Sequence, residues 1–295
     1  MDLSISIVNW NTRELLDQCL KSIFDTTKGI DFEVIVVDNA SSDDSMEMVH
    51  EKYPQVKSIL NSENVGFATA NNQAYEISSG KYFMLLNPDT IVLTDLSPVV
   101  DFLDSNNEVG VAGCKCINPD KSLQPNWYDY YPSFTWELLP EALRNIASKL
   151  IYKRNSDSAF ATKWVGGQCM TLRRECMDKV GAMDQNFFMY SEETDLCFRI
   201  KKLGWKIMHF PGITIVHIGG QSTKSVRTKM LIELYRSKNR FIRKNFCRLH
   251  SSFFKAGLIA RTHLLKAVTL VLASKNSRSA KVDQLNELLN AIRGF

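Results

Sequence analysis

Several patterns that mark large protein classes are missing from this sequence of 295 residues. No apolar run reaches about 18 residues, so we expect no membrane-spanning helix. The first residues, M-D-L-S-I-S-I-V-N-W, carry no basic stretch and no cleavage site, so we expect no signal peptide. With 44% hydrophobic and 23% charged residues and no repeat, the chain is neither disordered nor collagen-like. These absences leave a globular protein with a sizeable core.

Two phosphate-binding patterns are missing as well. The sequence contains neither G-x-G-x-x-G nor G-x-x-x-x-G-K-[ST], which argues against a dinucleotide-binding domain and against a P-loop enzyme. Its seven cysteines are scattered, and because only Cys114 and Cys116 lie close together, no second pair completes a zinc site. We therefore expect reduced thiols in a cytosolic protein.

The start of the chain alternates short apolar runs with amphipathic segments. The predicted strands are 4–8, 32–37, 56–60 and 82–86, and the predicted helices are 12–24, 42–52 and 67–79. Thr12 is the expected N-cap of the first helix. This alternation predicts an α/β fold with a doubly wound sheet, in which ligands bind beyond the carboxyl ends of the strands.

The rest of the chain is less regular. We predict a domain over 1–222 and a basic helical region over 223–295, with an irregular insertion rich in Trp, Tyr and Pro after residue 117. The further predicted elements are helices over 95–107, 173–180 and 192–203, strands over 109–116, 206–210 and 214–217, and a return to the sheet over 162–172.

Polar residues follow each of the first four predicted strands. They are Asn9, Asn11, Asp38, Asn64, Gly66 and Asp89. Because they fall at the carboxyl ends of strands, they are candidates for holding a polar ligand.

Each candidate also has an ordinary structural explanation. Asp38 could bind a base or a ribose, or it could begin an Asx turn or cap a helix. Gly66 could let a phosphate approach a helix N-terminus, or it could form a simple turn. Asp89, within N-P-D-T, is a natural Mg²⁺ or Mn²⁺ ligand or part of a Pro-Asp turn. His217 could join Asp89 on a metal or serve the fold alone.

Three carboxylates lie close together at the start of the helix predicted over 192–203, namely Glu192, Glu193 and Asp195. Acids in a first turn suit the helix dipole, but three exceed that need. Crowded like charges raise the pKa of at least one member, which suits a general base. Asp195 stands four residues before Arg199 and can pair with it, so we favour Glu193 over Asp195 as the catalytic base.

The order of the motifs is more specific than any one of them. Along the chain run V-V-D-N-A-S-S-D, E-N-V-G-F-A-T-A-N-N, L-L-N-P-D-T, V-G-G-Q-C-M-T-L-R-R, F-F-M-Y-S-E-E-T-D-L-C-F-R and V-H-I-G-G-Q-S. Over 4–245 this series resembles the family 2 inverting glycosyltransferases, above all their bacterial rhamnosyltransferase-like branch. The resemblance implies the A-type glycosyltransferase fold, a Rossmann-like, mostly parallel sheet flanked by helices. It also implies transfer of a sugar from a nucleotide-diphosphate donor to a hydroxyl of a glycan or lipid-linked acceptor in cell-surface polysaccharide synthesis.

The resemblance also implies roles for individual residues. Asp89 corresponds to the last carboxylate of the family's D-x-D metal motif and His217 to its downstream metal-binding histidine, so both would hold Mg²⁺ or Mn²⁺. Glu193 corresponds to the catalytic base, with Asp195 in the same element. The insertion over 118–160 would lie on the acceptor side. The residues implied to contact nucleotide, donor sugar or acceptor are Asn9, Asn11, Asp38, Asn64, Gly66, Asn72, Asn87, Trp164, Gly166 and Gly167.

Two positions depart from the family pattern. Asn87 stands where the first metal carboxylate is usual, and because its amide oxygen brings no charge we expect weaker metal binding or a contact through water. Glu193 replaces the usual aspartate and is one methylene longer. Both departures leave open an alternative, a catalytically silent protein that binds sugar nucleotides or glycans on the same fold.

The net charge of +4 conceals an uneven distribution. Residues 223–295 hold 16 Lys and Arg and three acids, a net +13, whereas residues 1–222 hold 20 Lys and Arg and 29 acids, a net −9. Lys255, Arg261 and Lys266 interleave with apolar residues, which predicts an amphipathic helix on an anionic membrane surface. Alternatively, this helix packs its apolar side on the catalytic domain and exposes a basic face. The apolar residues are Phe253, Phe254, Leu258, Ile259, Leu264, Leu265, Val268 and Leu272.

The basic region contains no recognition motif for nucleic acid, so we expect no nucleic-acid partner. Its composition instead favours a cytoplasmic protein that is bound peripherally to the inner face of the cell membrane.

Overall fold

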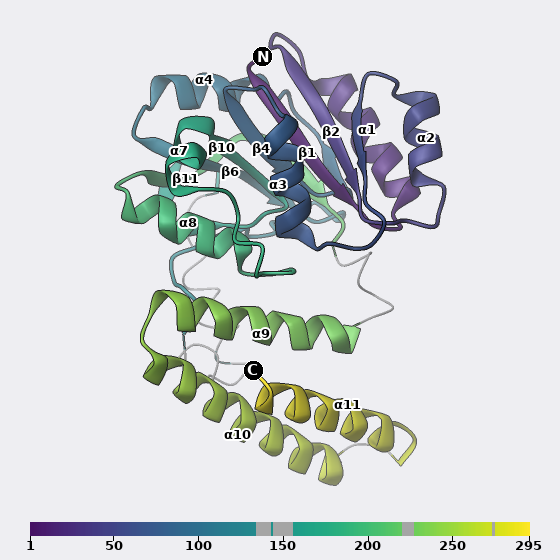
Figure 1. The fold of residues 1–295 in the computed structure, drawn as a ribbon, viewed down its shortest axis with the longest axis vertical. Helices are drawn as coiled ribbons and strands as arrows, with labels where there is room; N and C mark the ends of the chain where they lie inside the picture. The colour runs from purple at the N-terminus through teal and green to yellow at the C-terminus, as the bar shows by residue number, and fades with distance from the viewer. Residues whose placement is uncertain (134–142, 144–155, 220–226, 273–274) are drawn as a thin grey trace. The chain divides into compact units, whose positions relative to one another are not determined.

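The computed structural model describes residues 1–133, 143, 156–219, 227–272 and 275–295 (Figure 1). These residues fall into two compact units. The first unit contains the described parts of Met1–Tyr130, Arg154–Phe188 and Glu192–Ser222. The second unit contains the described parts of Tyr131–Lys153, Met189–Ser191 and Thr223–Phe295. Most of the predicted insertion over 118–160 lies outside the described residues.

The first unit is built on a mixed sheet of nine strands, as far as the chain is described. Eight follow one another across the sheet, and the ninth, β8 (Phe160–Thr162), pairs with β11. Their order is β3 (Lys57–Leu60), β2 (Phe32–Asp38), β1 (Leu3–Asn9), β4 (Tyr82–Leu86), β10 (Cys169–Arg173), β6 (Val109–Ile117), β11 (Lys206–His217) and β5 (Thr90–Val92).

Most strands of this sheet run the same way. The pairs β1–β2, β2–β3, β1–β4 and β6–β11 are parallel, whereas β10 is antiparallel to both β4 and β6. Six strands therefore share one direction, and β5, β8 and β10 oppose them. The predicted mostly parallel sheet is confirmed, and the carboxyl ends of β1, β2, β4, β6 and β11 meet along one edge.

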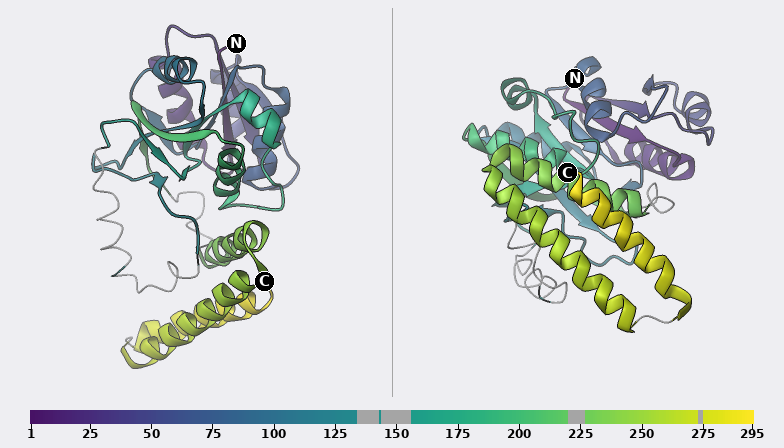
Figure 2. Two further views of the ribbon diagram at one scale, coloured as in Figure 1. Left: turned by 90° about the vertical axis from the view of Figure 1, so that its left-hand side faces the viewer. Right: turned by 60° about the horizontal axis from the view of Figure 1, so that its bottom comes forward.

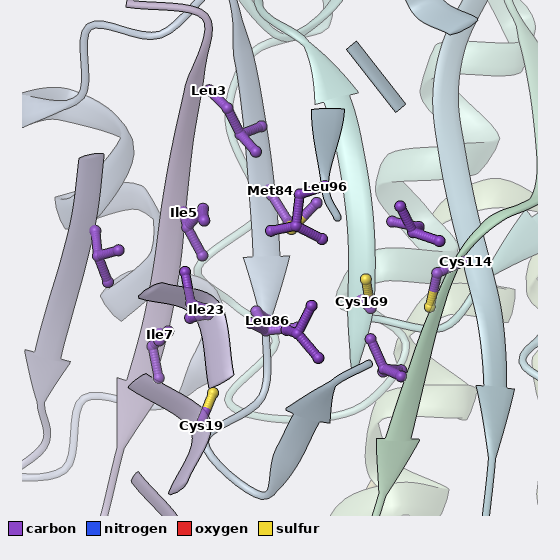
Figure 3. Packing of buried hydrophobic residues seen from close by; sticks show 14 of the residues in the cluster. Leu3, Ile5, Ile7, Cys19, Ile23, Met84, Leu86, Leu96, Cys114 and Cys169 are labelled. Atoms are coloured by element: carbon purple, nitrogen blue, oxygen red, sulfur yellow. The ribbon is translucent and has the colours of Figure 1, made fainter. Parts of the chain in front are cut away.

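Helices lie on both faces of the sheet, as the alternating side chains of β1 show. Leu3, Ile5 and Ile7 belong to a hydrophobic core with α1 (Arg13–Thr26) and α4 (Ser97–Ser105), including Cys19 and Ile23 of α1 (Figure 3). Successive strand residues point to opposite faces. The hydroxyl of Ser6 accordingly donates 2.7 Å to Asn71 of α3 (Phe67–Ile77), so α3 covers the face opposite α1.

Three further helices complete the first unit. They are α2 (Ser45–Lys52), which contacts α1, and α7 (Arg174–Val180) and α8 (Glu192–Lys202), which contact each other and the sheet. A separate two-stranded ribbon joins β7 (Trp127–Tyr128) to β9 (Trp164–Val165), so the segment predicted over 162–172 divides between two sheets.

Several predicted boundaries shift for local reasons. Two predicted strands, 206–210 and 214–217, form one strand, β11, whose pairing with β6 slips between His209 and Thr214. Proline at 211 offers no N–H to the ladder, which accounts for the irregularity there. Thr12 does stand at the N-cap of α1, but its hydroxyl donates 2.6 Å to Asn9 instead of capping the helix.

The second unit contains three long helices, α9 (Arg227–Asn245), α10 (Arg248–Leu272) and α11 (Lys275–Arg293), which contact one another (Figure 2). Lys255 donates to the main-chain oxygen of Phe295 at 2.8 Å and to that of Arg293 at 3.3 Å. Lys266 donates to the side-chain oxygen of Asn286 at 2.7 Å. Both lysine side chains therefore turn toward α11 and the residues that follow it.

All seven cysteines are free thiols, as expected, and only Cys247 is exposed. Burial raises the pKa of Cys19 to about 12, so this thiol stays protonated at neutral pH. Within the described residues, no helix is long and apolar enough to span a bilayer.

Candidate active site

The turn after β2 is tied to the end of β1 by a buried polar network. Asn9 donates 2.8 Å to the Asp38 carboxylate, which also accepts from the main-chain nitrogen of Ser41, at 2.8 Å, and from its hydroxyl, at 2.6 Å. Asn11 accepts 2.7 Å from the main chain of Ser42. Asp38 thus bonds the main chain three residues on, not two as in an Asx turn, and the network holds Asn9, Asn11 and Asp38 together at the carboxyl edge of the sheet.

Gly66 is required by a close backbone approach. Its φ is +85°, and a Cβ at this position would lie 2.5 Å from the main-chain oxygen of Phe188. The same oxygen of Phe188 accepts a hydrogen bond of 2.8 Å from the main-chain nitrogen of Phe67. The side-chain oxygen of Asn64 accepts one of 3.0 Å from the main-chain nitrogen of Gly66. The start of α3 is therefore closed by the segment that leads into α8.

Asn72 joins α3 to the same segment. Its amide nitrogen donates 2.8 Å to the oxygen of Met183, and its amide oxygen accepts 2.9 Å from the nitrogen of Met183. Only 4% of Asn72 is exposed. Both polar groups of this side chain therefore hold the main chain that precedes α8.

The ends of β4 and β11 bring Asp89 and His217 together. One carboxylate oxygen of Asp89 lies 3.3 Å from Nε2 of His217, and the amide nitrogen of Asn87 lies 3.5 Å from the same atom. The main-chain oxygen of Asp89 also accepts 3.0 Å from the main-chain nitrogen of Ile218. Asn87 and His217, which are 130 positions apart in the sequence, thus lie near one point at the carboxyl edge.

The tautomer of His217 is set by Gln124, in the chain that leaves β6. Nδ1 of His217 lies 2.8 Å from Oε1 of Gln124, whose amide nitrogen donates 2.8 Å to Asn118 and 3.3 Å to the oxygen of His217. With the amide nitrogen used in this way, Oε1 can only accept, so Nδ1 carries the proton. Nε2 then presents its lone pair toward Asp89.

This donor set fits a divalent cation. Nε2 of His217 and a carboxylate oxygen of Asp89 lie 3.3 Å apart, a spacing at which a proton or a metal ion can be shared between them. Carboxylate oxygen and imidazole nitrogen are ligands that Mn²⁺ and Mg²⁺ accept. Within the described residues, no three His, Cys, Asp or Glu side chains form a group that could hold a metal ion.

A short turn connects this pair to Glu193. The nitrogen of Asn87 donates 3.1 Å to the oxygen of Gln168, in the turn between β9 and β10. A Cβ built on Gly167, the preceding residue, would lie 3.9 Å from Cβ of Glu193 and 3.4 Å from the Phe67 ring. Asn87, two residues before Asp89, and Glu193 therefore both lie close to the turn formed by Gly166, Gly167 and Gln168.

Asp195 has a different environment from Glu193. It is fully buried and accepts 2.9 Å from Arg199, which also donates to the main-chain oxygens of Val180, Gly181 and Ala182. The predicted pair of Asp195 and Arg199 is confirmed. It fixes the first turns of α8 against the chain that follows α7.

An aromatic pair stands beside Glu193. Tyr128 and Trp164 stack with ring centres 3.8 Å apart, and the indole nitrogen of Trp164 donates 2.7 Å to the oxygen of Tyr130. Burial raises the pKa of Tyr128, so its hydroxyl remains neutral. Helix α8, which carries Glu193 in its first turn, contacts β9, which carries Trp164.

Sequence reasoning missed Gln124 and Tyr128. Gln124 lies 93 residues before His217, in a segment without periodicity, so no spacing rule connects them. Tyr128 belongs to the aromatic insertion. The Trp, Tyr and Pro content of that insertion indicated a binding loop, and this was the available sequence signal for Tyr128.

Comparison with known families agrees with this geometry. The family described as Glycosyl transferase family 2 matches residues 4–181, more than half of the chain. The chain belongs to this family. It is therefore an inverting glycosyltransferase, and the predicted family is confirmed.

Its curated relatives include two rhamnosyltransferases. The N-acetylglucosaminyl-diphospho-decaprenol L-rhamnosyltransferase of Mycobacterium tuberculosis is 24% identical over 79% of this chain and 82% of its own length. The rhamnosyltransferase WbbL of Escherichia coli is 25% identical over 64% of this chain and 76% of its own length. Both similarities extend over most of each protein.

Solved structures share the fold at low sequence identity. A mannosyltransferase of Pyrobaculum calidifontis, in complex with GDP-Man and Mn²⁺, has a TM-score of 0.60 and 17% identity over 99% of this chain and 86% of its own. TarS residues 1–349 of S. aureus give a TM-score of 0.55 and 16% identity over 100% of this chain and 92% of theirs. The A-type glycosyltransferase fold is thereby confirmed.

Proposed function

We propose that this glycosyltransferase moves a sugar from a nucleotide-diphosphate donor to a hydroxyl of a lipid-linked glycan, with Glu193 as base and Asp89 and His217 as metal ligands. The observation that carries the proposal is the turn of Gly166, Gly167 and Gln168, which bonds Asn87 beside the Asp89 pair and also lies close to Glu193. A leaving group and an attacking hydroxyl need groups on opposite sides of the sugar.

The donor's diphosphate belongs on the Asp89 side. A bound Mg²⁺ or Mn²⁺ would neutralise charge that develops on the leaving diphosphate. Asp89 and His217 would hold this ion, and Gln124 keeps Nε2 of His217 available to it. Asn87 adds a neutral donor and no charge, which favours a site completed by the substrate. The Mn²⁺ in the related mannosyltransferase structure supports this reading.

The acceptor belongs on the Glu193 side. Glu193 would accept the proton of the acceptor hydroxyl, whose oxygen attacks the anomeric carbon from the face opposite the diphosphate and inverts its configuration. Trp164, Gly166 and Gly167 would border the sugars, because they form the strand and turn beside Glu193. Asp195 is bound to Arg199, so we assign it the positioning of α8 rather than proton transfer.

The nucleotide belongs at the ends of β1, β2 and β3. Asn9, Asn11 and Asp38 are held there by Ser41 and Ser42, and Asn64 and Gly66 form the adjoining turn. We propose that this edge receives the base and ribose. Asn72 would shape the pocket by fixing the chain at Met183.

The proposed class of acceptor, a lipid-linked glycan, is inferred from the name of a relative. The mycobacterial relative is named for a decaprenol-linked acceptor, and a lipid-linked acceptor places the enzyme at a bilayer surface. We accordingly propose peripheral attachment to the cytoplasmic face of an anionic membrane, for which the net +13 of residues 223–295 is the supporting observation.

A thermal-shift screen of nucleotide sugars with Mg²⁺, Mn²⁺ or chelator tests this function. We expect one donor class to stabilise the protein only when a divalent ion is present, since ligand binding raises the midpoint of unfolding. Release of nucleoside diphosphate from that donor then separates an enzyme from a catalytically silent binder. No cation-dependent stabilisation by any donor would refute the proposed metal site.

A further inference from the structure

One side of α10 exposes a row of large apolar side chains. Between 44% and 76% of each is accessible, which is unusual for four such residues on one side of a helix. They are Leu249, Leu264, Val268 and Val271. Their spacing of about three or four residues, or multiples of it, places them on one side of the helix, called here the outer face of α10.

The opposite side of α10 is already occupied. Ser251, Phe254, Leu258 and Thr262 are buried and share the same helical spacing. Ser251 donates 2.8 Å to Asn239 of α9. The helix is therefore apolar on two sides, and α9 and α11 account for only one of them. A second apolar side normally requires a second partner.

The charges around the outer face have one sign. No Asp or Glu occurs from Leu234 to Val282. Exposed cations stand at the turn between α9 and α10, namely Arg243, Lys244 and Arg248. Lys255 and Lys266 turn toward α11 and its end, which keeps charge away from the middle of the outer face.

We propose that the outer face of α10 inserts into the interfacial layer of an anionic lipid bilayer, with α10 lying parallel to the surface. The cations at the α9–α10 turn would contact lipid phosphates. This inference deepens the proposed function and rests on it for the lipid-linked acceptor. A second copy of the chain fits this face less well, because two acid-free cationic surfaces would repel each other.

Vesicle co-sedimentation of the full chain tests the docking face. We expect binding to vesicles that contain phosphatidylglycerol, weaker binding to pure phosphatidylcholine, and a loss of binding at high salt. The triple variant Leu264→Gln, Val268→Gln, Val271→Gln should bind at least about tenfold more weakly. A matched control, Ile77→Gln, Leu93→Gln, Leu203→Gln, removes three exposed apolar residues elsewhere and should bind like the wild type.

Two results would overturn the proposal. One is wild-type vesicle binding by the α10 variant. The other is a wild-type dimer in light scattering that the α10 variant converts to a monomer, which would make this face a self-association surface. Nucleotide-sugar binding measured on the same samples separates this test from the proposed function, because neither set of substitutions touches the site at the sheet edge.

Discussion

At the scale of single residues, the orientation of His217 is decided by Gln124. The hydrogen bond between Nδ1 and Oε1 leaves Nε2 as the only nitrogen that can bind a metal. Asp89 and Asn87 both have polar atoms within 3.5 Å of Nε2. Four residues from three parts of the chain therefore meet at this point.

Replacement of Gln124 should weaken metal binding without removing a ligand. Gln124→Leu frees His217 to rotate or change tautomer, so we expect Mn²⁺ affinity to fall about 10- to 100-fold. Gln124→Glu keeps an acceptor for Nδ1 and should retain most of that affinity. Calorimetry with Mn²⁺ measures both, and imidazole ¹⁵N shifts report the tautomer. Equal Mn²⁺ affinity in all three proteins would refute the role of Gln124.

At the scale of elements, the close contact between the start of α3 and Phe188 depends on one glycine. Gly66→Ala combines an unfavourable positive φ with a Cβ 2.5 Å from a main-chain oxygen. Gly29 has a φ of +74° with open space around it, so Gly29→Ala isolates the conformational term. We expect a loss of about 1 kcal/mol for Gly29→Ala and about 2–4 kcal/mol for Gly66→Ala by urea unfolding. Equal losses of stability in the two variants would show that Phe188 moves away from the added Cβ without cost.

A second element-scale feature is the carboxylate of Glu33 on β2. Burial opposes its ionisation, but bonds from Lys57, Ser4 and Ser79 prevail and hold its pKa at about 2. The pKa of Glu33 is lower in the folded protein than in the unfolded chain, where it is near 4.5. The ionised carboxylate therefore contributes its full stabilisation of the fold above pH 4.5, and this contribution is lost as the pH falls toward 2.

Unfolding free energies of wild type and Glu33→Gln should therefore converge in acid. We expect Glu33→Gln to be about 3 kcal/mol less stable at neutral pH and nearly equal to wild type below pH 2, by urea unfolding across this range. Glu14→Gln, which alters a side chain that is 81% exposed, serves as the control and should change little. A difference that does not depend on pH would contradict the assigned pKa.

The elements show how far sequence reasoning reaches. Alternating apolar and amphipathic runs predicted β1, α1, β2, α3 and β4, because each buries residues in the period of its own structure. The antiparallel insertion of β10 between β4 and β6 follows from tertiary pairing, which periodicity does not encode. In α10 the spacing predicted an amphipathic helix, but the position of α11 decides where Lys255 and Lys266 point.

At the scale of the whole molecule, the sheet edge collects groups that are dispersed in sequence. Motif order and family resemblance pointed to Asp89, Glu193 and His217, and the shared direction of β4 and β11 explains how Asp89 and His217 meet. The supporting contacts of Gln124 and Gln168 come from irregular chain, so they could be found only in three dimensions. The fold was thus more predictable than the details that position its chemistry.

The central claim is that Glu193 takes the proton from the acceptor while Asp89 and His217 serve the donor. Nucleoside diphosphate release from the donor found by thermal shift, with a membrane lipid extract as acceptor, tests it in wild type, Glu193→Gln and Glu193→Asp. We expect Glu193→Gln to bind the donor as wild type does and to lose turnover by about 100-fold or more, whereas Glu193→Asp retains measurable turnover. Near wild-type turnover in Glu193→Gln would contradict the account.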